Sequence, residues 1–490
     1  MPEKRKVKFI NQLAYGVGDI YGGGSFFLIS TFSMFFFINV AGLSPLLAGL
    51  IPGLGKVWDA ISDPWMGYIT DNTKSRFGRR RVFFLIAIIP ILISSSLIWL
   101  PVHFDNQIYT FLFYFFAYLF FYTVSTMTMV PYSALCTEMS EDFKERNRLS
   151  GTRMVFSVFS TMAVALFAEK IIKTQSDPGL GHLYMGMVFA CLFAVPWLFV
   201  FLGTWELPVK KVNNEETLGI FRNFKTIFQN KSFRIHIIMY IAAYSTMDIV
   251  MAWLKFYLTD YLGKPGLLSL GLTILIITEL LMLPLYIMLA NWKSHGVALI
   301  TGLSIWGVAM ILFSMHTSET SNFLILANCF LIGVGLSAAV VMPWSMLPFV
   351  TDVDTLITGK HRAGTYAGAM TLIRKLIQGG FVLPLLGLVL TLIGYQTPNA
   401  AQIQNKDLII QSATTLSWMK SLFILMPLAM IVLGIVASTF FRINKKSHGL
   451  MMAELARLDS GGKRSDVDPK VKAVCEQLSG KVYENLYPVN

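Results

Sequence analysis

Long apolar segments recur along the whole chain, and their length limits what it can fold into. Each has about 20 residues or more, which is the length that a helix needs to cross the hydrocarbon core of a bilayer. The segments cover residues 12–41, 46–70, 82–102, 107–135, 152–172, 181–204, 235–262, 266–290, 297–315, 322–350, 364–394 and 416–441. The sequence therefore predicts an all-α membrane protein with twelve transmembrane helices.

The composition supports this prediction independently. Hydrophobic residues make up 54% of the chain and charged residues only 14%, which is far from the balance of soluble domains. Basic residues gather in alternate loops, beside the first span and after spans two, four, six, ten and twelve. By the positive-inside rule, both termini lie in the cytoplasm. Short clusters of this kind usually meet anionic headgroups, so we expect membrane lipids as partners and no nucleic acid.

A weak internal repeat divides the chain. The strings PYSAL at 131–135 and PWSML at 343–347 end spans four and ten, and they begin 212 residues apart. Each leads through a polar loop to a Gly-Thr pair. The repeat favours two related six-helix bundles, with chance similarity of five-residue strings as the alternative. The predicted organisation is an amino-terminal bundle, a cytoplasmic middle loop, a carboxy-terminal bundle and a cytoplasmic tail, at 1–205, 206–234, 235–442 and 443–490.

Two acids stand inside the second apolar segment. Asp59 and Asp63 are four residues apart, so a helix would place both carboxylates on one face. Because burying one carboxylate in hydrocarbon costs about 3 kcal/mol, such acids normally face a bundle interior and mark an ion or proton path. The alternative is a structural ion cluster in which Lys56 pairs with the two acids.

Several further motifs carry a family resemblance that spans nearly the whole chain. They are YGVGD at 15–19, KVWDAISDP at 56–64, GYITD at 67–71, RFGRR at 76–80, PYSAL at 131–135 with Glu138, Arg148-Leu149, Arg153, and Arg362-Ala-Gly364 with Lys375 eleven residues on. The chain resembles the glycoside-pentoside-hexuronide:cation symporters of the major facilitator superfamily, which include the melibiose carriers. The resemblance implies two pseudo-symmetric six-helix bundles and cation-coupled symport.

The resemblance also implies roles for individual residues. Asp59, Asp63 and Thr126 occupy the positions that bind the coupling cation in the family. Carboxylate and hydroxyl oxygens suit Na⁺, and two like charges in one pocket also favour a shared proton, so Na⁺ and H⁺ are both candidates. Lys375 resembles a lysine near the cation pocket, and Arg153 resembles an arginine that helps to hold the sugar. Each could instead extend to the cytoplasmic interface.

The family's sugar clamp is incomplete here. Its two acids are replaced by Gly23 and Met129, and a lost charged hydrogen bond typically costs about 1.5–3 kcal/mol, so melibiose itself is not the expected substrate. The remaining candidates for substrate binding are Arg153, Lys375, Trp344, Asp19, Tyr122 and Thr128. Trp344 could stack on a pyranose face, although an aromatic residue in a helix more often serves packing.

Charged residues near the predicted cytoplasmic ends suggest a gate. Salt bridges among them would hold that side shut in an outward-open state, each exposed pair contributing about 0–1 kcal/mol. The candidates are Asp71, Arg76, Arg80, Glu138, Arg148, Asp352, Asp354 and Arg362. In span seven, Asp248 and Lys255 lie near one helix face, and span eight contains a further acid, Glu279. An ion pair in the interior between helices is one option for these residues, and the sequence leaves their role open.

The sequence has no nucleophile elbow, zinc spacing or phosphate loop, so an enzyme is not expected. The leading hypothesis is a multi-pass transporter of the plasma membrane, most simply a bacterial inner membrane. It would carry a small sugar or glycoside together with Na⁺ or H⁺ by alternating access, without a cofactor and as a monomer. A cation-coupled carrier of an amphipathic substrate such as a lysolipid is the alternative, and a transporter-like sensor or scaffold is a third. The tail is expected to form a short amphipathic helix at 450–458, followed by either another short helix or a flexible segment.

Overall fold

The computed structural model describes residues 7–140, 143–206, 226–359, 362–398 and 410–487. Most of residues 206–234, the predicted middle loop, therefore lie outside the described residues. Ten helical stretches in the described part are long and apolar enough to span a membrane, and α4 is a shorter apolar helix. The remaining span, α3, has the length but carries Lys56, Asp59 and Asp63. Each of the twelve predicted segments coincides with one of these helical stretches, which confirms the all-helical membrane fold.

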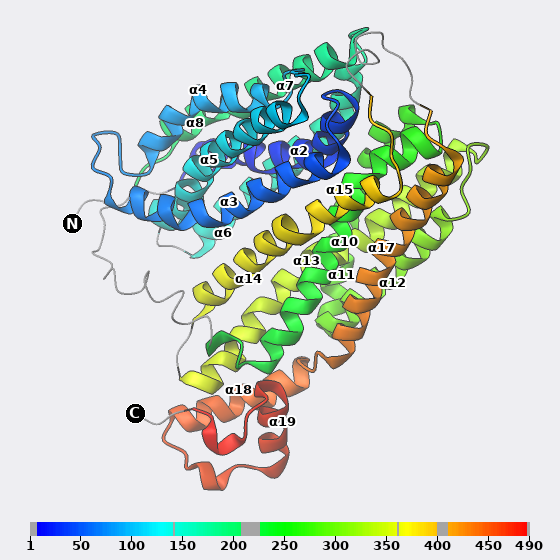
Figure 1. Ribbon diagram of the computed structural model, residues 1–490. Helices are drawn as coiled ribbons and strands as arrows, with labels where there is room; N and C mark the ends of the chain where they lie inside the picture. The colour runs from blue at the N-terminus through cyan, green and yellow to red at the C-terminus, as the bar shows by residue number, and fades with distance from the viewer. Residues whose placement is uncertain (1–6, 141–142, 207–225, 360–361, 399–409, 488–490) are drawn as a thin grey trace.

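The helices form two bundles and a tail (Figure 1). The amino-terminal bundle contains α1 (Phe9–Gly16), α2 (Asp19–Asn39), α3 (Pro45–Asn72), α4 (Arg81–Leu97), α5 (Gln107–Met139), α6 (Phe143–Ile172), α7 (Pro178–Ala194) and α8 (Pro196–Gly203). The carboxy-terminal bundle contains α10 (Lys231–Phe256), η1 (Tyr257–Tyr261), η2 (Pro265–Leu267), α11 (Leu268–Trp292), α12 (His295–Phe313), α13 (Asn322–Thr358), α14 (Ala363–Ile377), η3 (Gln378–Val382), α15 (Leu383–Leu392) and α17 (Ala413–Phe440).

The eleventh span changes its winding in the middle. Its α14 and α15 parts are joined by η3, a single π-helical turn that contains Gly379 and Gly380. Pro384, the second residue of α15, has no backbone N–H to donate to the preceding turn. Such turns are frequently found at functional sites, and this one begins three residues after Lys375.

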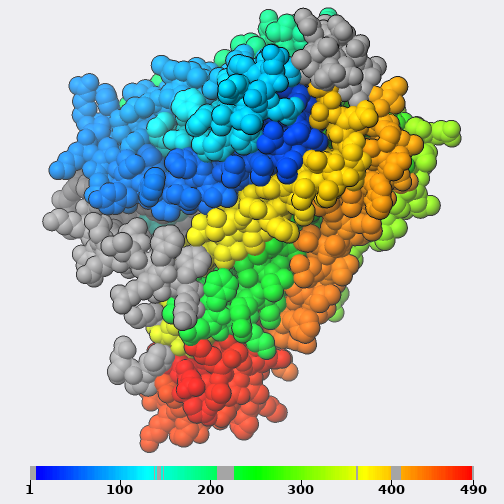
Figure 2. All heavy atoms as spheres, in the orientation of Figure 1, coloured from blue at the N-terminus to red at the C-terminus, as the bar shows by residue number. Residues whose placement is uncertain are grey.

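The two bundles meet most closely at the end opposite the tail, which we call the far end. There α3 packs against α15 and η3, as the contact between the blue and yellow surfaces in Figure 2 shows. A Cβ added to Gly49 would lie 2.8 Å from the carbonyl oxygen of Leu383, and one added to Gly53 would lie 2.5 Å from that of Gly379. Only glycine permits this approach, since real Cβ atoms essentially never come so near.

The same helices separate toward the tail end. Gly67 follows Gly49 by about five helical turns, so both lie on one face of α3. A Cβ added to Gly67 would meet nothing within 4 Å, and the same holds for Gly364 and Gly368 on α14. The bundles therefore touch at the far end and diverge toward the tail end.

Polar contacts reinforce the closure at the far end. Lys255 of α10 reaches across the interface to Glu169 of α6, with Nζ 3.4 Å from Oε2 and side chains only 4% and 10% exposed. Its ammonium also lies over the rings of Phe32 and Phe35, 4.7 and 4.3 Å from their centroids. Tyr395, which follows α15, donates its hydroxyl to either Asp260 or Asn39 of α2, at 2.7 and 3.2 Å.

The tail docks on the carboxy-terminal bundle. It contains α18 (Lys445–Asp459), which confirms the predicted amphipathic helix, and α19 (Pro469–Ser479), which shows that the segment beyond it is also helical. Met451, Leu455 and Leu458 of α18 are buried. His448 lies 2.8 Å from Asp352 of α13, and Ser232 of α10 donates to the carbonyl oxygen of Leu478 at 2.7 Å.

Candidate functional site

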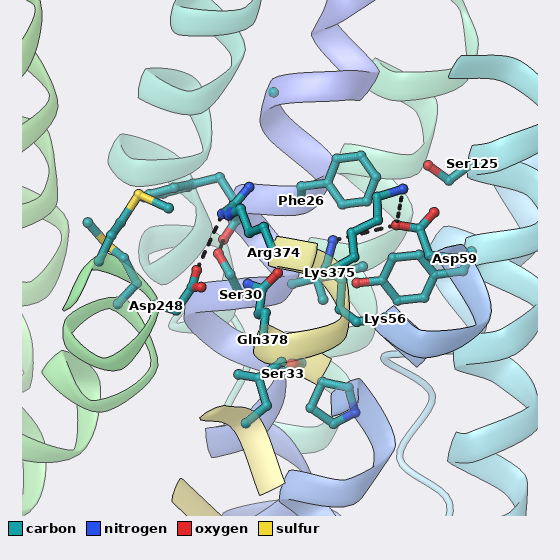
Figure 3. Close-up of a pocket in the computed structure, with 18 of the residues that line it drawn as sticks. Phe26, Ser30, Ser33, Lys56, Asp59, Ser125, Asp248, Arg374, Lys375 and Gln378 are labelled. Carbon is teal, nitrogen blue, oxygen red and sulfur yellow. Dashed lines mark hydrogen bonds and ion pairs between the residues drawn. The ribbon is translucent and has the colours of Figure 1, made fainter. Parts of the chain in front are cut away.

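A cavity of about 750 Å³ lies between the two bundles. Side chains of α2, α3 and α5 line one wall, and side chains of α10, α11 and α14 line the other. Figure 3 shows the charged groups of both walls pointing toward one another. Gly23 and Met129, which replace the sugar-binding acids of the melibiose carriers, both line this cavity. The amino-terminal wall is therefore less polar than the family resemblance implies for a sugar carrier.

The predicted cation residues come together on that wall. The Thr126 hydroxyl lies 3.2 Å from Asp59 Oδ1 and 3.1 Å from Asp63 Oδ1, so it can donate to either carboxylate. The Ser62 hydroxyl lies 3.0 Å from the Thr126 hydroxyl and extends the set of oxygens. The Asp59 side chain is only 6% exposed, whereas Asp63 is 35% exposed. Two carboxylates and two hydroxyls form a donor set that fits a hard cation such as Na⁺.

Lys375 contacts both carboxylates from the opposite bundle. Its Nζ lies 2.9 Å from Asp59 Oδ2 and 2.5 Å from Asp63 Oδ2. Lys56, on the same helix as the acids, is more distant, with Nζ 3.8 Å from Asp59 Oδ2. The Lys56 ammonium instead lies over the rings of Phe26 and Tyr122. The interior position inferred for Lys375 is thus what the structure shows, and Lys375 ties the bundles together at the carboxylates.

The neighbouring residue, Arg374, points to a different acid. Successive residues of a helix are rotated by about 100°, so Arg374 and Lys375 cannot share a direction. Figure 3 shows Lys375 directed to Asp59 and Arg374 directed to Asp248 of α10. The Arg374 Nη2 to Asp248 Oδ1 distance is 3.6 Å, and the guanidinium lies 4.2 Å from the centroid of Tyr244. Asp248 and Lys255 therefore do not pair with each other. Asp248 pairs with Arg374 within its own bundle, and Lys255 pairs with Glu169 across the interface at the far end.

The other candidates for substrate binding are dispersed. Tyr122 lines the cavity. The Thr128 hydroxyl is buried and donates to the Val124 carbonyl oxygen of its own helix at 2.9 Å. Asp19 and Arg153 form an ion pair of 3.1 Å, with the guanidinium 4.8 Å from the centroid of the Tyr132 ring. Neither Asp19, Arg153 nor Thr128 is among the described residues that line the cavity.

Trp344 has a supporting position. Its indole N–H donates to the Tyr244 hydroxyl at 3.0 Å, and its ring meets the edge of Tyr240. Trp344 is outside the cavity lining of the described chain, but it fixes the tyrosine on which Arg374 stacks.

The gating candidates pair within single bundles in this conformation. Arg80 contacts Asp71 and Glu138 at 2.7 Å each in the amino-terminal bundle. Arg362 contacts Asp354 at 2.6 Å in the carboxy-terminal bundle, and this hydrogen bond raises the pKa of the guanidinium. The remaining candidates include Asp352, which contacts His448 of the tail, Arg76, which lies over the Phe77 ring, and Arg148, which is exposed.

Sequence reasoning missed three contributors to these networks. Arg374 was not singled out from the sequence, although it lines the cavity. Glu169 gave no signal beyond being an acid in a predicted span. Glu206 accepts hydrogen bonds from the backbone N–H groups of residues 79, 80 and 81, at 2.9, 2.9 and 2.8 Å. An acid is favourable at a helix N-terminus, but nothing in the sequence connects residue 206 with the start of α4.

Comparison with known proteins agrees with this architecture. Residues 14–445 match the family model described as MFS/sugar transport protein. A putative sulfoquinovose importer of Salmonella typhimurium is 24% identical, over 94% of this chain and 95% of its own. The sodium-dependent lysophosphatidylcholine symporter 1-A of Danio rerio is 21% identical, over 85% of this chain and 82% of its own. The crystal structure of a D-xylose–proton symporter superposes with a TM-score of 0.60 at 15% identity, covering 89% of this chain and 98% of that one, and so shows the shared fold. The family match spans most of the chain and confirms the resemblance read from the motifs: this chain belongs to the MFS/sugar transport protein family of the major facilitator transporters.

Proposed function

We propose that this protein is a cation-coupled symporter that moves a small sugar or glycoside across the plasma membrane by alternating access. The observation that carries the proposal is the cluster of Asp59, Asp63 and Thr126 on the wall of a cavity between two bundles, with Lys375 of the opposite bundle on its carboxylates. Intramembrane acids mark ion pathways. The same assignment is supported by the relatives, which include a putative sulfoquinovose importer and a sodium-dependent lysophosphatidylcholine symporter.

Coupling follows from competition for the carboxylates. Lys375 is a tethered cation that contacts Asp59 and Asp63 when no coupling cation is bound, and together with Lys56, 3.8 Å from Asp59, it balances their charge. Na⁺ or H⁺ takes over this neutralisation and releases Lys375, which removes an ion contact between the bundles. The empty carrier returns with Lys375 on the acids and the loaded carrier with the coupling cation on them. In neither case do two uncompensated carboxylates face the low-dielectric interior, where each would cost several kcal/mol.

The direction of access follows from the charge distribution. The predicted topology puts the tail and the basic loops in the cytoplasm. The closed far end then faces outside, and the divergent tail end makes this conformation inward-facing. In the outward-facing state, the gating residues of the two bundles, among them Arg80 and Asp354, would approach one another and exchange partners. Each new pair contributes about 0–1 kcal/mol if exposed, a bias small enough to let the carrier cycle.

The test is solute uptake by proteoliposomes that contain the purified full-length chain. Candidate sugars are supplied with an imposed Na⁺ gradient, an imposed pH gradient or neither. We expect accumulation with one gradient, and loss of accumulation in Asp59→Asn and Asp63→Asn. Lys472→Gln removes an exposed charge of the tail that pairs with Glu484, and it serves as the matched control with unchanged uptake. Gradient-driven accumulation that persists unchanged in both aspartate variants would sink the assignment.

A carrier of a lysolipid is the second candidate. The Danio rerio relative is named for lysophosphatidylcholine, and Gly23, Phe26 and Met129 give the cavity an apolar wall. Thermal stabilisation by a panel of sugars and lysolipids, with and without Na⁺, separates the two. A shift with lysolipids and none with any sugar would make the lysolipid the substrate.

A further inference from the structure

The polar groups of the cavity are unevenly divided between its walls. Beyond the cation cluster and Lys56, the amino-terminal wall presents chiefly apolar residues and small hydroxyls, including Phe26, Phe27 and Met129. The opposite wall presents Asp248 of α10, Glu279 of α11, and Arg374 and Gln378 of the eleventh span. A substrate that needs charged hydrogen-bond partners therefore finds them on the carboxy-terminal bundle.

The Asp248 and Arg374 pair has bonding capacity to spare. The distance of 3.6 Å between Nη2 and Oδ1 is longer than a hydrogen bond of a charged pair, which is about 2.7–2.9 Å. The Nε of Arg374 is buried and has no hydrogen-bond partner among the described residues. A guanidinium has five N–H donors and a carboxylate can accept several hydrogen bonds. Leaving the buried Nε of Arg374 unsatisfied is costly, so the arrangement is suited to a ligand that completes it.

The aromatic residues behind Arg374 fix its direction. The guanidinium stacks on Tyr244, whose hydroxyl accepts from the indole of Trp344 at 3.0 Å. Trp344 and Tyr244 thus act as positioning residues for Arg374. Rigid support of this kind lowers the entropy lost on binding.

We infer that Asp248 and Arg374 form a substrate clamp on the carboxy-terminal bundle, which binds neighbouring hydroxyl groups of an uncharged sugar. Asp248 accepts a hydrogen bond from one hydroxyl while Arg374 donates to the oxygen of the next. The inference rests on the proposed function and adds to it which bundle recognises the substrate. The clamp lies on the wall opposite Gly23 and Met129, and it takes the place of the sugar-binding acids that are missing at those two positions.

The charges of the cavity favour an uncharged ligand. Arg374 is neutralised by Asp248, and the ammonium groups of Lys375 and Lys56 together offset the carboxylates of Asp59 and Asp63. Glu279, which also lines the cavity, has no ion-pair partner among the described residues. An anionic sugar would approach both Asp248 and Glu279, and like charges at close range are unfavourable.

The experiment measures sugar-induced and Na⁺-induced thermal shifts of the purified full-length protein. Neutral pentoses, hexoses and methyl glycosides are compared with hexuronates, and the probe is the neutral sugar with the largest shift. In Asp248→Asn and in Arg374→Gln, its affinity should fall at least about ten-fold, as expected for a charged hydrogen bond. The Na⁺-induced shift should remain, because the cation cluster is untouched.

A matched control comes from the tail. Glu454 and Arg457 form an ion pair with side chains 4% and 31% exposed, close to the 6% and 28% of Asp248 and Arg374. Glu454→Gln should leave sugar affinity unchanged. The double variant Asp248→Arg with Arg374→Asp keeps the ion pair but exchanges the positions of the hydrogen-bond donor and acceptor. If the pair is a clamp, this variant loses its affinity for the sugar. If the pair is purely structural, the affinity is retained.

The outcomes separate the two proposals. Sugar affinity that survives in both single variants, or returns in the exchanged double variant, overturns the clamp and leaves the proposed transport intact. Selective stabilisation by hexuronates over neutral sugars overturns the uncharged ligand class. Absence of any sugar-induced shift in the unmodified protein overturns both the clamp and sugar symport.

Discussion

Lys375→Met tests whether the lysine competes with the coupling cation. The Lys375 ammonium contacts Asp59 at 2.9 Å and Asp63 at 2.5 Å, with the first acid 6% and the second 35% exposed. Removing one partner of a buried ion pair typically costs about 3–5 kcal/mol, because an uncompensated charge is left behind. Since solvent reaches Asp63, we discount this cost to about 2 kcal/mol for the empty protein.

A bound cation relieves that cost, since it neutralises the carboxylates itself. The variant therefore gains about 2 kcal/mol for cation binding relative to the unmodified chain, which corresponds to an affinity about 30-fold higher. Net uptake should nevertheless slow, because the empty carrier must return with two acids whose only remaining cationic neighbour among the described residues is Lys56, 3.8 Å from Asp59. Exchange of internal for external sugar with cation on both sides avoids the empty carrier and should persist.

The assay is a Na⁺ titration of thermal unfolding at constant ionic strength, paired with net uptake and exchange in proteoliposomes. Lys375→Arg keeps the charge. Lys56→Met removes an ammonium that lies 3.8 Å from Asp59. Both should change Na⁺ affinity much less than Lys375→Met does. A lower Na⁺ affinity in Lys375→Met than in the unmodified protein would refute the competition, because it would mean that Lys375 assists cation binding.

Three further predictions concern the gates and the tail. In Gly49→Leu, the new Cβ would lie 2.8 Å from a carbonyl oxygen of α15, so the far end cannot close as observed. A membrane-impermeant thiol reagent should then reach a cysteine engineered into the cavity from the outside. Labelling at the same rate as in the parent would argue against this gate. Glu169→Gln removes the buried partner of Lys255 and should raise the same labelling, while an unchanged rate would show that the pair does not hold the closure. Burial raises the pKa of Glu454, but hydrogen bonds from Arg457 and a nearby tyrosine outweigh it and lower the pKa below its ordinary value of 4.5. The contribution of the Glu454 carboxylate to the stability of the tail is therefore full above pH 4.5 and is lost as the pH falls through its lower pKa in the folded tail. Proteolysis of the tail should accordingly accelerate at acidic pH. A Glu454→Gln variant whose tail is equally resistant to proteolysis at pH 7 would contradict this reasoning.

The spans could be predicted because each reflects a local property. About 20 apolar residues are enough to cross a bilayer, whatever the rest of the chain does. Asp59 and Asp63 were likewise placed on one face by their spacing alone. Thr126 and Lys375 needed the family resemblance, since neither is near the acids in sequence.

Pairings between helices could not be predicted in this way. Asp248 and Lys255 share a helix, and their spacing indicates a shared face but not which helix stands opposite. Asp248 meets α14 and Lys255 meets α6, on different sides of the bundle interface. The prediction that Thr128 binds substrate could not be checked from the sequence for a related reason. A hydroxyl on a helix can donate its hydrogen bond to a backbone carbonyl oxygen of the same helix, as Thr128 does, instead of facing the cavity.

Coupled binding at equilibrium tests the central assignment most directly. If Asp59 and Asp63 hold the coupling cation, the cation must tighten sugar binding by the same factor by which the sugar tightens cation binding. Sugar affinity measured over a series of cation concentrations, and the reverse, should give one common factor in the unmodified protein. In Asp63→Asn, the account predicts that this factor falls to about one. A coupling factor that is unchanged in that variant would contradict it.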